Sequence, residues 1–107
     1  MTAQPPYEVR YFERREIGKA IAFAEDGGIA VHRNLDSYHG QRSRGGVLMH
    51  KPFVHVLGLR PVLAAWAREH AVPLRAIQPE GRRRVAHIDL FGRYAATLIT
   101  QLRARDA

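Results

Sequence analysis

Two side chains near the C-terminal end of the sequence combine the types that acid/base chemistry needs. His87 and Asp89 stand two residues apart, in a segment where apolar and polar residues alternate. Because successive side chains of a strand point to opposite faces, both are expected on one face of a sheet. A histidine beside a carboxylate can act as an oriented general base or as a metal ligand. The alternative interpretation is that His87 is an ordinary exposed strand residue and that Asp89 caps a helix.

His32 is the third candidate catalytic residue, because Ile29 and Val31 take the core side of its short strand. Glu8 and Arg10 fall on the corresponding side of the first strand. If these strands are neighbours, their polar side chains converge with those of the last strand on one exposed sheet face. Acid/base chemistry on an anionic substrate is the reaction class that such a face predicts.

The remaining histidines show no recognisable metal-binding pattern. His50 and His55 are five residues apart, which puts them on opposite faces of a regular strand unless Pro52 introduces a bulge. The HExxH pattern and the usual zinc-binding spacings are missing, and the chain contains no cysteine. We therefore expect no metal site and no cofactor. In the enzyme interpretation, His55 is expected only to assist His87.

Two arginine-rich stretches predict contact with phosphate groups. The segment 34–46 combines arginines, glycines and an aromatic ring, which together can grip a phosphate backbone and stack on a base. The run 82–84 is the densest positive charge in the chain, and each arginine can form two parallel hydrogen bonds with a phosphate. A solvated loop and a protected sheet edge are the alternative interpretations. The residues expected to bind nucleic acid are Arg33, Tyr38, His39, Arg42, Arg44, Lys51, Arg82, Arg83 and Arg84.

Composition defines the class of protein. The 107 residues include 17 basic and 10 acidic ones, for a formal net charge of +7, and 46% are hydrophobic. Such a chain can bury one core, and clustered positive charge favours a polyanionic partner. No apolar run is long enough to cross a bilayer, and the N-terminus has no secretory signal. The sequence predicts a cytoplasmic protein of bacterial or phage type with no membrane partner.

The elements that position these residues follow from hydrophobic periodicity and turn residues. Residues 1–6 are expected to form a disordered leader, and a single domain with a long basic loop at 34–46 spans residues 7–107. Pro73 to Gln78 is a candidate strand, and Trp66 and Phe91 are expected in the core. The expected elements are a strand at 7–14, a helix at 15–26, strands at 29–33 and 47–57, a helix at 61–70, strands at 73–78 and 82–88, and a last helix that Asp89 caps.

This β-α-β-β-α-β-β-α order predicts an α+β fold. Its first six elements match the ferredoxin-like order, in which helices cover one face of the sheet and leave the other open. Three functions stay open. The first is a small nucleic-acid-binding domain, and the second is a protein-interaction or accessory subunit with an acidic partner. The third is a small phosphoesterase or nuclease-like enzyme that uses His87 and Asp89. The choice between DNA and RNA and the oligomeric state stay open as well.

Overall fold

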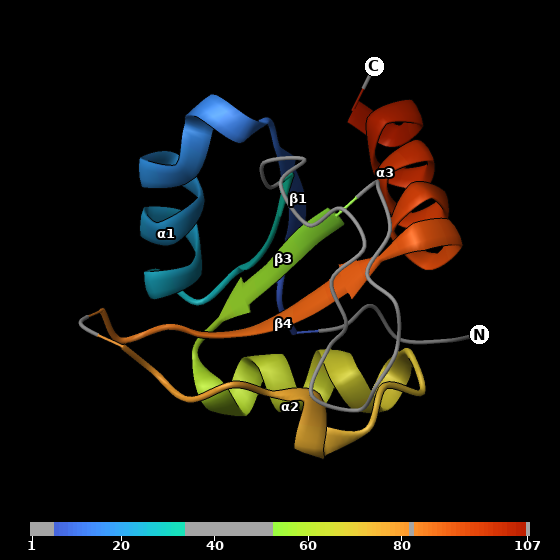
Figure 1. Ribbon diagram of the computed structural model, residues 1–107. Helices are drawn as coiled ribbons and strands as arrows, with labels where there is room; N and C mark the ends of the chain where they lie inside the picture. Colours follow the sequence, from blue (N-terminus) through green and yellow to red (C-terminus); the bar gives the residue numbers. More distant parts are fainter. Residues whose placement is uncertain (1–5, 34–52, 82, 107) are drawn as a thin grey trace.

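A four-stranded mixed sheet and three α-helices form a single compact α+β domain (Figure 1). The computed structural model describes residues 6–33, 53–81 and 83–106, so most of the expected leader and the whole expected loop at 34–46 lie outside the described residues. The expected α+β class is confirmed. The elements are β1 (Val9–Phe12), the 3-10 helix η1 (Arg14–Glu16), α1 (Ile17–Glu25), β2 (Ile29–Arg33), β3 (Phe53–Gly58), α2 (Arg60–Glu69), the 3-10 helix η2 (Leu74–Ala76), β4 (Ala86–Phe91) and α3 (Gly92–Asp106).

The strands lie in the sheet in the order β1-β2-β3-β4. β1 and β2 are parallel neighbours connected by α1, and the β2–β3 and β3–β4 pairs are antiparallel. In the split arrangement of a ferredoxin-like sheet, another strand separates the two strands that the first helix joins. Here these two strands pair directly, so the observed strand order differs from the ferredoxin-like one.

The expected strand at 73–78 is wrong. Leu74–Ala76 form η2, and Gln78 makes only an isolated bridge with His87 of β4. Pro73 precedes η2 and, having no N–H, cannot donate a hydrogen bond to a strand ladder. Leu74 is 45% exposed, whereas Ala76 and Ile77 pack against the larger core, so the buried residues of this segment do not alternate as they would in a strand.

Helices cover both faces of the sheet, whereas one covered face was expected. α1 packs on β1, β2 and β3 from one side, and its apolar residues meet the inward side chains of that face. α2 and α3 pack on the opposite face, which carries the larger core. The core under α1 contains Phe12, Ala20, Ala24, Ala30, Leu57 and Val85. The larger core contains Ile29, Val31, Val54, Val56, Leu63, Trp66, Ala67, Ala86, Ile88, Ala95, Leu98, Ile99 and Leu102.

β4 continues past the position where a helix was expected. Ile88 is fully buried and Leu90 is half-buried, so the alternation of inward and outward residues extends beyond Asp89. α3 begins at Gly92, whose φ of 70° lets the chain turn sharply at the end of the strand. Asp89 is therefore a strand residue and does not cap α3. Across the described ranges, none of the helices combines the length and the hydrophobicity that crossing a bilayer takes.

Candidate functional site

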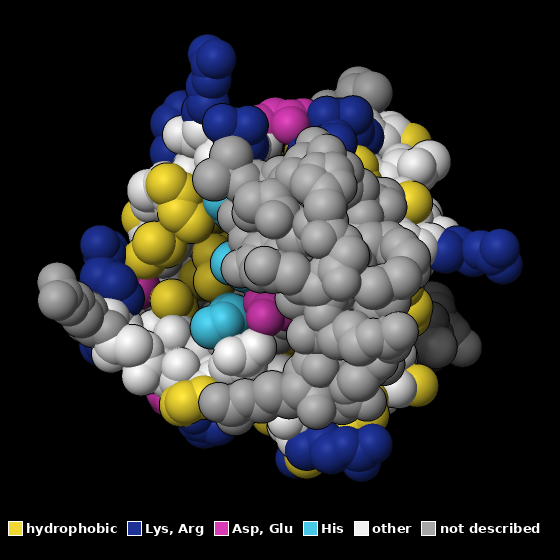
Figure 2. Space-filling view, viewed as in Figure 1, with side chains coloured by type: hydrophobic (Ala, Val, Ile, Leu, Met, Phe, Trp, Pro, Cys, Tyr) yellow, Lys and Arg dark blue, Asp and Glu magenta, His cyan; other side chains and the backbone are white. Residues whose placement is uncertain are grey.

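A row of polar side chains crosses the sheet on the face against which α1 packs. The register places His32 of β2 opposite His55 of β3, and His55 opposite Asp89 of β4. Because directly paired residues share a face, these three side chains stand in line across three strands. His87 is on the same face, two residues earlier in β4. Figure 2 shows histidine side chains on this face beside an acidic side chain and a hydrophobic patch, with Lys and Arg side chains around the margin.

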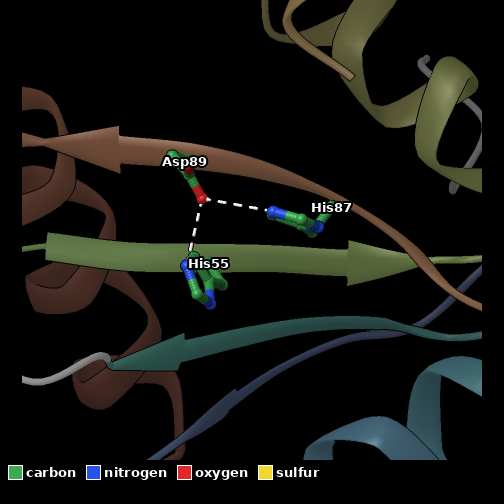
Figure 3. Close-up of side chains that lie close together, drawn as sticks. All are labelled: His55, His87 and Asp89. Atoms are coloured by element: carbon green, nitrogen blue, oxygen red, sulfur yellow. Dashed lines mark ion pairs between the residues drawn. The ribbon is translucent and has the colours of Figure 1, made fainter. Parts of the chain in front are cut away.

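The Asp89 carboxylate lies between the imidazole rings of His55 and His87 (Figure 3). Its Oδ1 atom is 3.0 Å from His55 Nε2 and 3.7 Å from His87 Nε2. The other carboxylate oxygen, Oδ2, accepts a hydrogen bond of 2.7 Å from the side-chain amide of Gln78. We call His55, His87 and Asp89 the histidine–aspartate cluster. Their side chains are 25%, 31% and 25% exposed, whereas the Oδ1 atom of Asp89 is itself buried.

The surroundings of the cluster determine which of its groups carry charge. Burial and the neighbouring His55 lower the pKa of His87 and outweigh Asp89, which raises it. Burial raises the pKa of Asp89, but contacts with His55, His87 and Gln78 outweigh burial and hold this pKa below its ordinary value. At neutral pH His87 is therefore an uncharged imidazole with a nitrogen lone pair, and Asp89 is ionised. These are the forms in which both groups accept protons or bind metal ions.

His32 belongs to the row but stands apart from the cluster. Its side chain is 4% exposed, and Nε2 lies 2.9 Å from the carbonyl oxygen of Arg14. Since a carbonyl can only accept, Nε2 carries the hydrogen and Nδ1 holds the lone pair. Nδ1 is buried without a hydrogen-bond partner among the described residues, and burial lowers the pKa of His32. The structure thus brings His87 and Asp89 together, and places His55 rather than His32 against them.

His55 lies directly opposite Asp89, although it was expected only as a group that assists His87. Val54 and Val56 are fully buried in the larger core, so the alternation within β3 alone puts His55 on the opposite face. That signal is present in the sequence. What the sequence does not show is the register of β3 on β4, which brings His55 directly opposite Asp89. His50, considered together with His55, lies outside the described residues.

A shallow groove of about 700 Å³ lies on the same face, lined mainly by residues of β1 and α1. Its wall carries the basic residues Arg10, Lys19 and Arg84, the acidic residues Glu25 and Asp26, and the rings of Phe12 and Phe23. Phe12 pairs with His32 in the sheet, so the groove begins two strands away from His55. Two strand spacings correspond to about 10 Å.

Two of the arginines considered in the sequence form ion pairs within the chain: Arg10, expected on this face, and Arg83, expected to bind nucleic acid. Arg10 pairs with Glu8 at 3.0 Å, and its guanidinium lies 4.8 Å from the centre of the Phe23 ring. Arg83 pairs with Glu25 at 2.7 Å, and the hydrogen bond from Arg83 lowers the pKa of Glu25. A ligand that recruited Arg83 would have to break this pair.

The other residues expected to bind nucleic acid divide into two groups. Arg33, at the end of β2, interacts with the hydroxyl of Tyr11 and the carboxylate of Glu13, and Arg84 lines the groove. Tyr38, His39, Arg42, Arg44, Lys51 and Arg82 lie outside the described residues. Among the described residues, the structure therefore places the histidine–aspartate cluster and the groove on one sheet face, with Arg84 of the predicted set in the groove.

Comparisons with known proteins give no independent indication of function. A scan against protein-family models, a search of curated proteins and a search of solved structures each found no match for this chain, so its function has to be inferred from the residues of the site.

Proposed function

We propose that this protein is a small hydrolytic enzyme that acts on a phosphate ester, with the histidine–aspartate cluster as its reactive centre. One observation carries the proposal. Two imidazole nitrogens, from His55 and His87, approach the same carboxylate oxygen of Asp89 on a partly exposed sheet face. Groups of this kind generate a nucleophile from water, by accepting its proton or by holding a metal ion that acidifies it.

The energetics of the cluster favour a functional role over a stabilising one. Asp89 is three-quarters buried and ionised, and removing a carboxylate from water costs free energy that ion pairs seldom recover in full. An apolar side chain at this position of β4 would avoid that cost. Shifted pKa values in a cluster that opens to solvent are typical of reactive sites.

The groove indicates the class of substrate. Its cationic groups Arg10, Lys19 and Arg84 lie on the same face as the cluster, and guanidinium groups bind phosphate oxygens with charge-assisted hydrogen bonds. Because about 10 Å separates the rim of the groove from His55, a substrate would reach both only if it extended beyond a single phosphate. We therefore propose a phosphodiester or a phosphate ester with a sizeable substituent. The net charge of +7 supports an anionic substrate.

The proposal is tested by hydrolysis of bis(p-nitrophenyl) phosphate at neutral pH, with release of p-nitrophenol as the readout. His87→Ala should lower kcat by about 10²–10⁴-fold, the usual contribution of a group that handles a proton or its metal-ion equivalent. Arg84→Ala should raise KM by about tenfold with kcat nearly unchanged, because it removes a charge-assisted contact made throughout the reaction.

Two variants serve as matched controls. His70→Gln changes a histidine at the end of α2 that stacks on Trp66, remote from the cluster in sequence and on the other side of the sheet. Arg75→Ala changes an arginine of η2 that does not line the groove. Both should keep wild-type turnover. Equal turnover of wild type and His87→Ala, or no turnover of any phosphate ester by the wild-type chain, would rule out the proposed function.

A further inference from the structure

We propose that the histidine–aspartate cluster binds one divalent transition-metal ion of the Zn²⁺ type. Its ligands are His55 Nε2, His87 Nε2 and Asp89 Oδ1. This inference deepens the proposed function, because it assigns a cofactor to the same reactive centre. The three ligand atoms come from neighbouring strands and all lie within 4.8 Å of one another.

The two distances from the Asp89 carboxylate to the imidazole nitrogens are close to those between ligands of a tetrahedral zinc ion. Bond lengths of 2.0–2.2 Å to nitrogen and oxygen put two ligands of a tetrahedron about 3.3 Å apart. The observed separations from Asp89 Oδ1, 3.0 Å to His55 and 3.7 Å to His87, lie on either side of this value. The two imidazole nitrogens lie within 4.8 Å of each other, and an ion at the centre would hold them about 3.3 Å apart.

The carboxylate is held so that one oxygen is available to a metal ion. Oδ2 is taken by the amide of Gln78 at 2.7 Å. Gln78 is itself anchored to a neighbouring ligand residue, because its backbone N–H donates to the His87 carbonyl at 2.7 Å. Oδ1 accepts no well-aligned hydrogen bond from the described residues, although His55 Nε2 is 3.0 Å away. Hydrogen bonds that orient a metal ligand from behind are common in metal sites.

The donor set selects the kind of ion. Ca²⁺ and Mg²⁺ prefer sites built from oxygen atoms, whereas two imidazoles and one carboxylate suit Zn²⁺ and its first-row neighbours. Three protein ligands leave the fourth tetrahedral position for water, as in catalytic zinc sites. The three side chains are between a quarter and a third exposed, and Asp89 Oδ1 lies on their buried side. A zinc-bound water loses its proton near neutral pH, which would supply the hydroxide that the proposed hydrolysis requires.

The test measures metal binding directly, apart from activity. The full-length chain is treated with a chelator, desalted and titrated with Co²⁺, whose visible absorption bands report four-coordinate geometry; Zn²⁺ is then added as competitor. We expect one Co²⁺ per chain and full displacement by Zn²⁺. Asp89→Asn and His55→Gln should each weaken Zn²⁺ binding more than about 100-fold. Gln78→Ala, which removes only the orienting hydrogen bond, should weaken it about 10–100-fold.

Each outcome of this test has a defined consequence. His70→Gln should bind like wild type, and circular dichroism should show that Gln78→Ala, a change at an exposed position, keeps the fold. The inference is overturned if wild type binds neither ion, if Asp89→Asn and His55→Gln bind normally, or if Fe²⁺ or Mn²⁺ displaces Zn²⁺ from the site. Zinc binding without hydrolysis of any phosphate ester would remove the proposed function and keep the metal site. Hydrolysis by a wild-type chain that binds neither ion would do the reverse.

Discussion

Replacing Gly28 with alanine should destabilise the protein through one contact. Gly28 precedes β2, and a Cβ atom there would lie 2.3 Å from Cε2 of Phe23 and 2.7 Å from two further atoms of that ring. The Gly28 N–H donates to the carbonyl of Phe23 at 3.1 Å, which fixes the two backbones relative to each other. Positive φ angles occur at Gly27 and Gly92 but not at Gly28, so the cost at Gly28 is steric rather than conformational.

The size of the effect depends on whether the Phe23 ring can move. The ring packs on Phe12 with centres 5.6 Å apart, and the guanidinium of Arg10 lies over it, so it is held from two sides. Overpacking of this kind costs ~1–3 kcal/mol of unfolding free energy. In a domain of about this size, 1 kcal/mol corresponds to a change in Tm of ~4–8 °C. Gly28→Ala should therefore lower Tm by at least about 4 °C.

Urea unfolding followed by circular dichroism tests this reasoning in a double-mutant cycle with Phe23→Ala. Once the ring is removed, Gly28→Ala should become neutral or stabilise the protein by ~0.4–1 kcal/mol, because alanine restricts the unfolded chain. The matched control is Gly18→Ala in α1, where a Cβ would meet no atom within 4 Å; it should stabilise the helix by up to ~1 kcal/mol. An equal cost of Gly28→Ala with and without the Phe23 ring would refute the steric explanation.

Three further predictions concern stability. The hydrogen bond from Arg103 lowers the pKa of Glu13, so this contribution to stability is complete above the ordinary pKa of 4.5 and is lost as the pH falls through the lower folded-state value. Glu13→Gln should flatten the acid limb of stability measured by urea unfolding. Burial and Glu69 raise the pKa of Tyr7, so unfolded chains ionise first above the ordinary value of 10.0 and stability falls as the pH rises; Tyr7→Phe should reduce this alkaline loss. Leu63→Ala, at a fully buried position, should cost ~2–5 kcal/mol in the same assay.

Alternation within strands predicted one part of the structure well, because it is a local property. Ala86 and Ile88 are fully buried, and His87 and Asp89 are half-buried on the other face, as the two-residue period requires. The same rule, applied to β3, puts His55 on the face that carries His87 and Asp89. A strand pattern thus identifies which residues share a face, even though it says nothing about which strand lies alongside.

Segment boundaries failed where two local signals competed. Asp89 is a favoured residue at the start of a helix, but burial of Ile88 and Leu90 holds this segment in β4 until Gly92. The stretch from Pro73 to Gln78 has strand-like composition, but within the described ranges it pairs with a strand only through the bridge at Gln78. In both cases tertiary contacts, which the sequence does not reveal, decide the outcome.

Ion pairs between distant residues could not be predicted either. Arg83 and Glu25 are 58 residues apart in the chain, and Arg103 and Glu13 are 90 apart. Each pair depends on how elements pack after folding, so a count of arginines overstates the charge available to a partner. This is why the arginine run at 82–84 carries less weight than the cluster and the groove in the proposed function.

The position of the cluster follows from the width of α1. A helix is about 10 Å across and so covers roughly two strand spacings, whereas this sheet has four strands. α1 packs on β1, β2 and β3, and the sheet surface beneath it is apolar. β4 lies beyond that cover, so the polar side chains that β4 presents on this face displace little of the core. The opposite face of the same strands is filled by Val54, Val56 and Ile88, all fully buried, which holds the two backbones in register. His55, His87 and Asp89 stand on two directly paired strands, and placement on regular elements of this kind is what the proposed metal site requires.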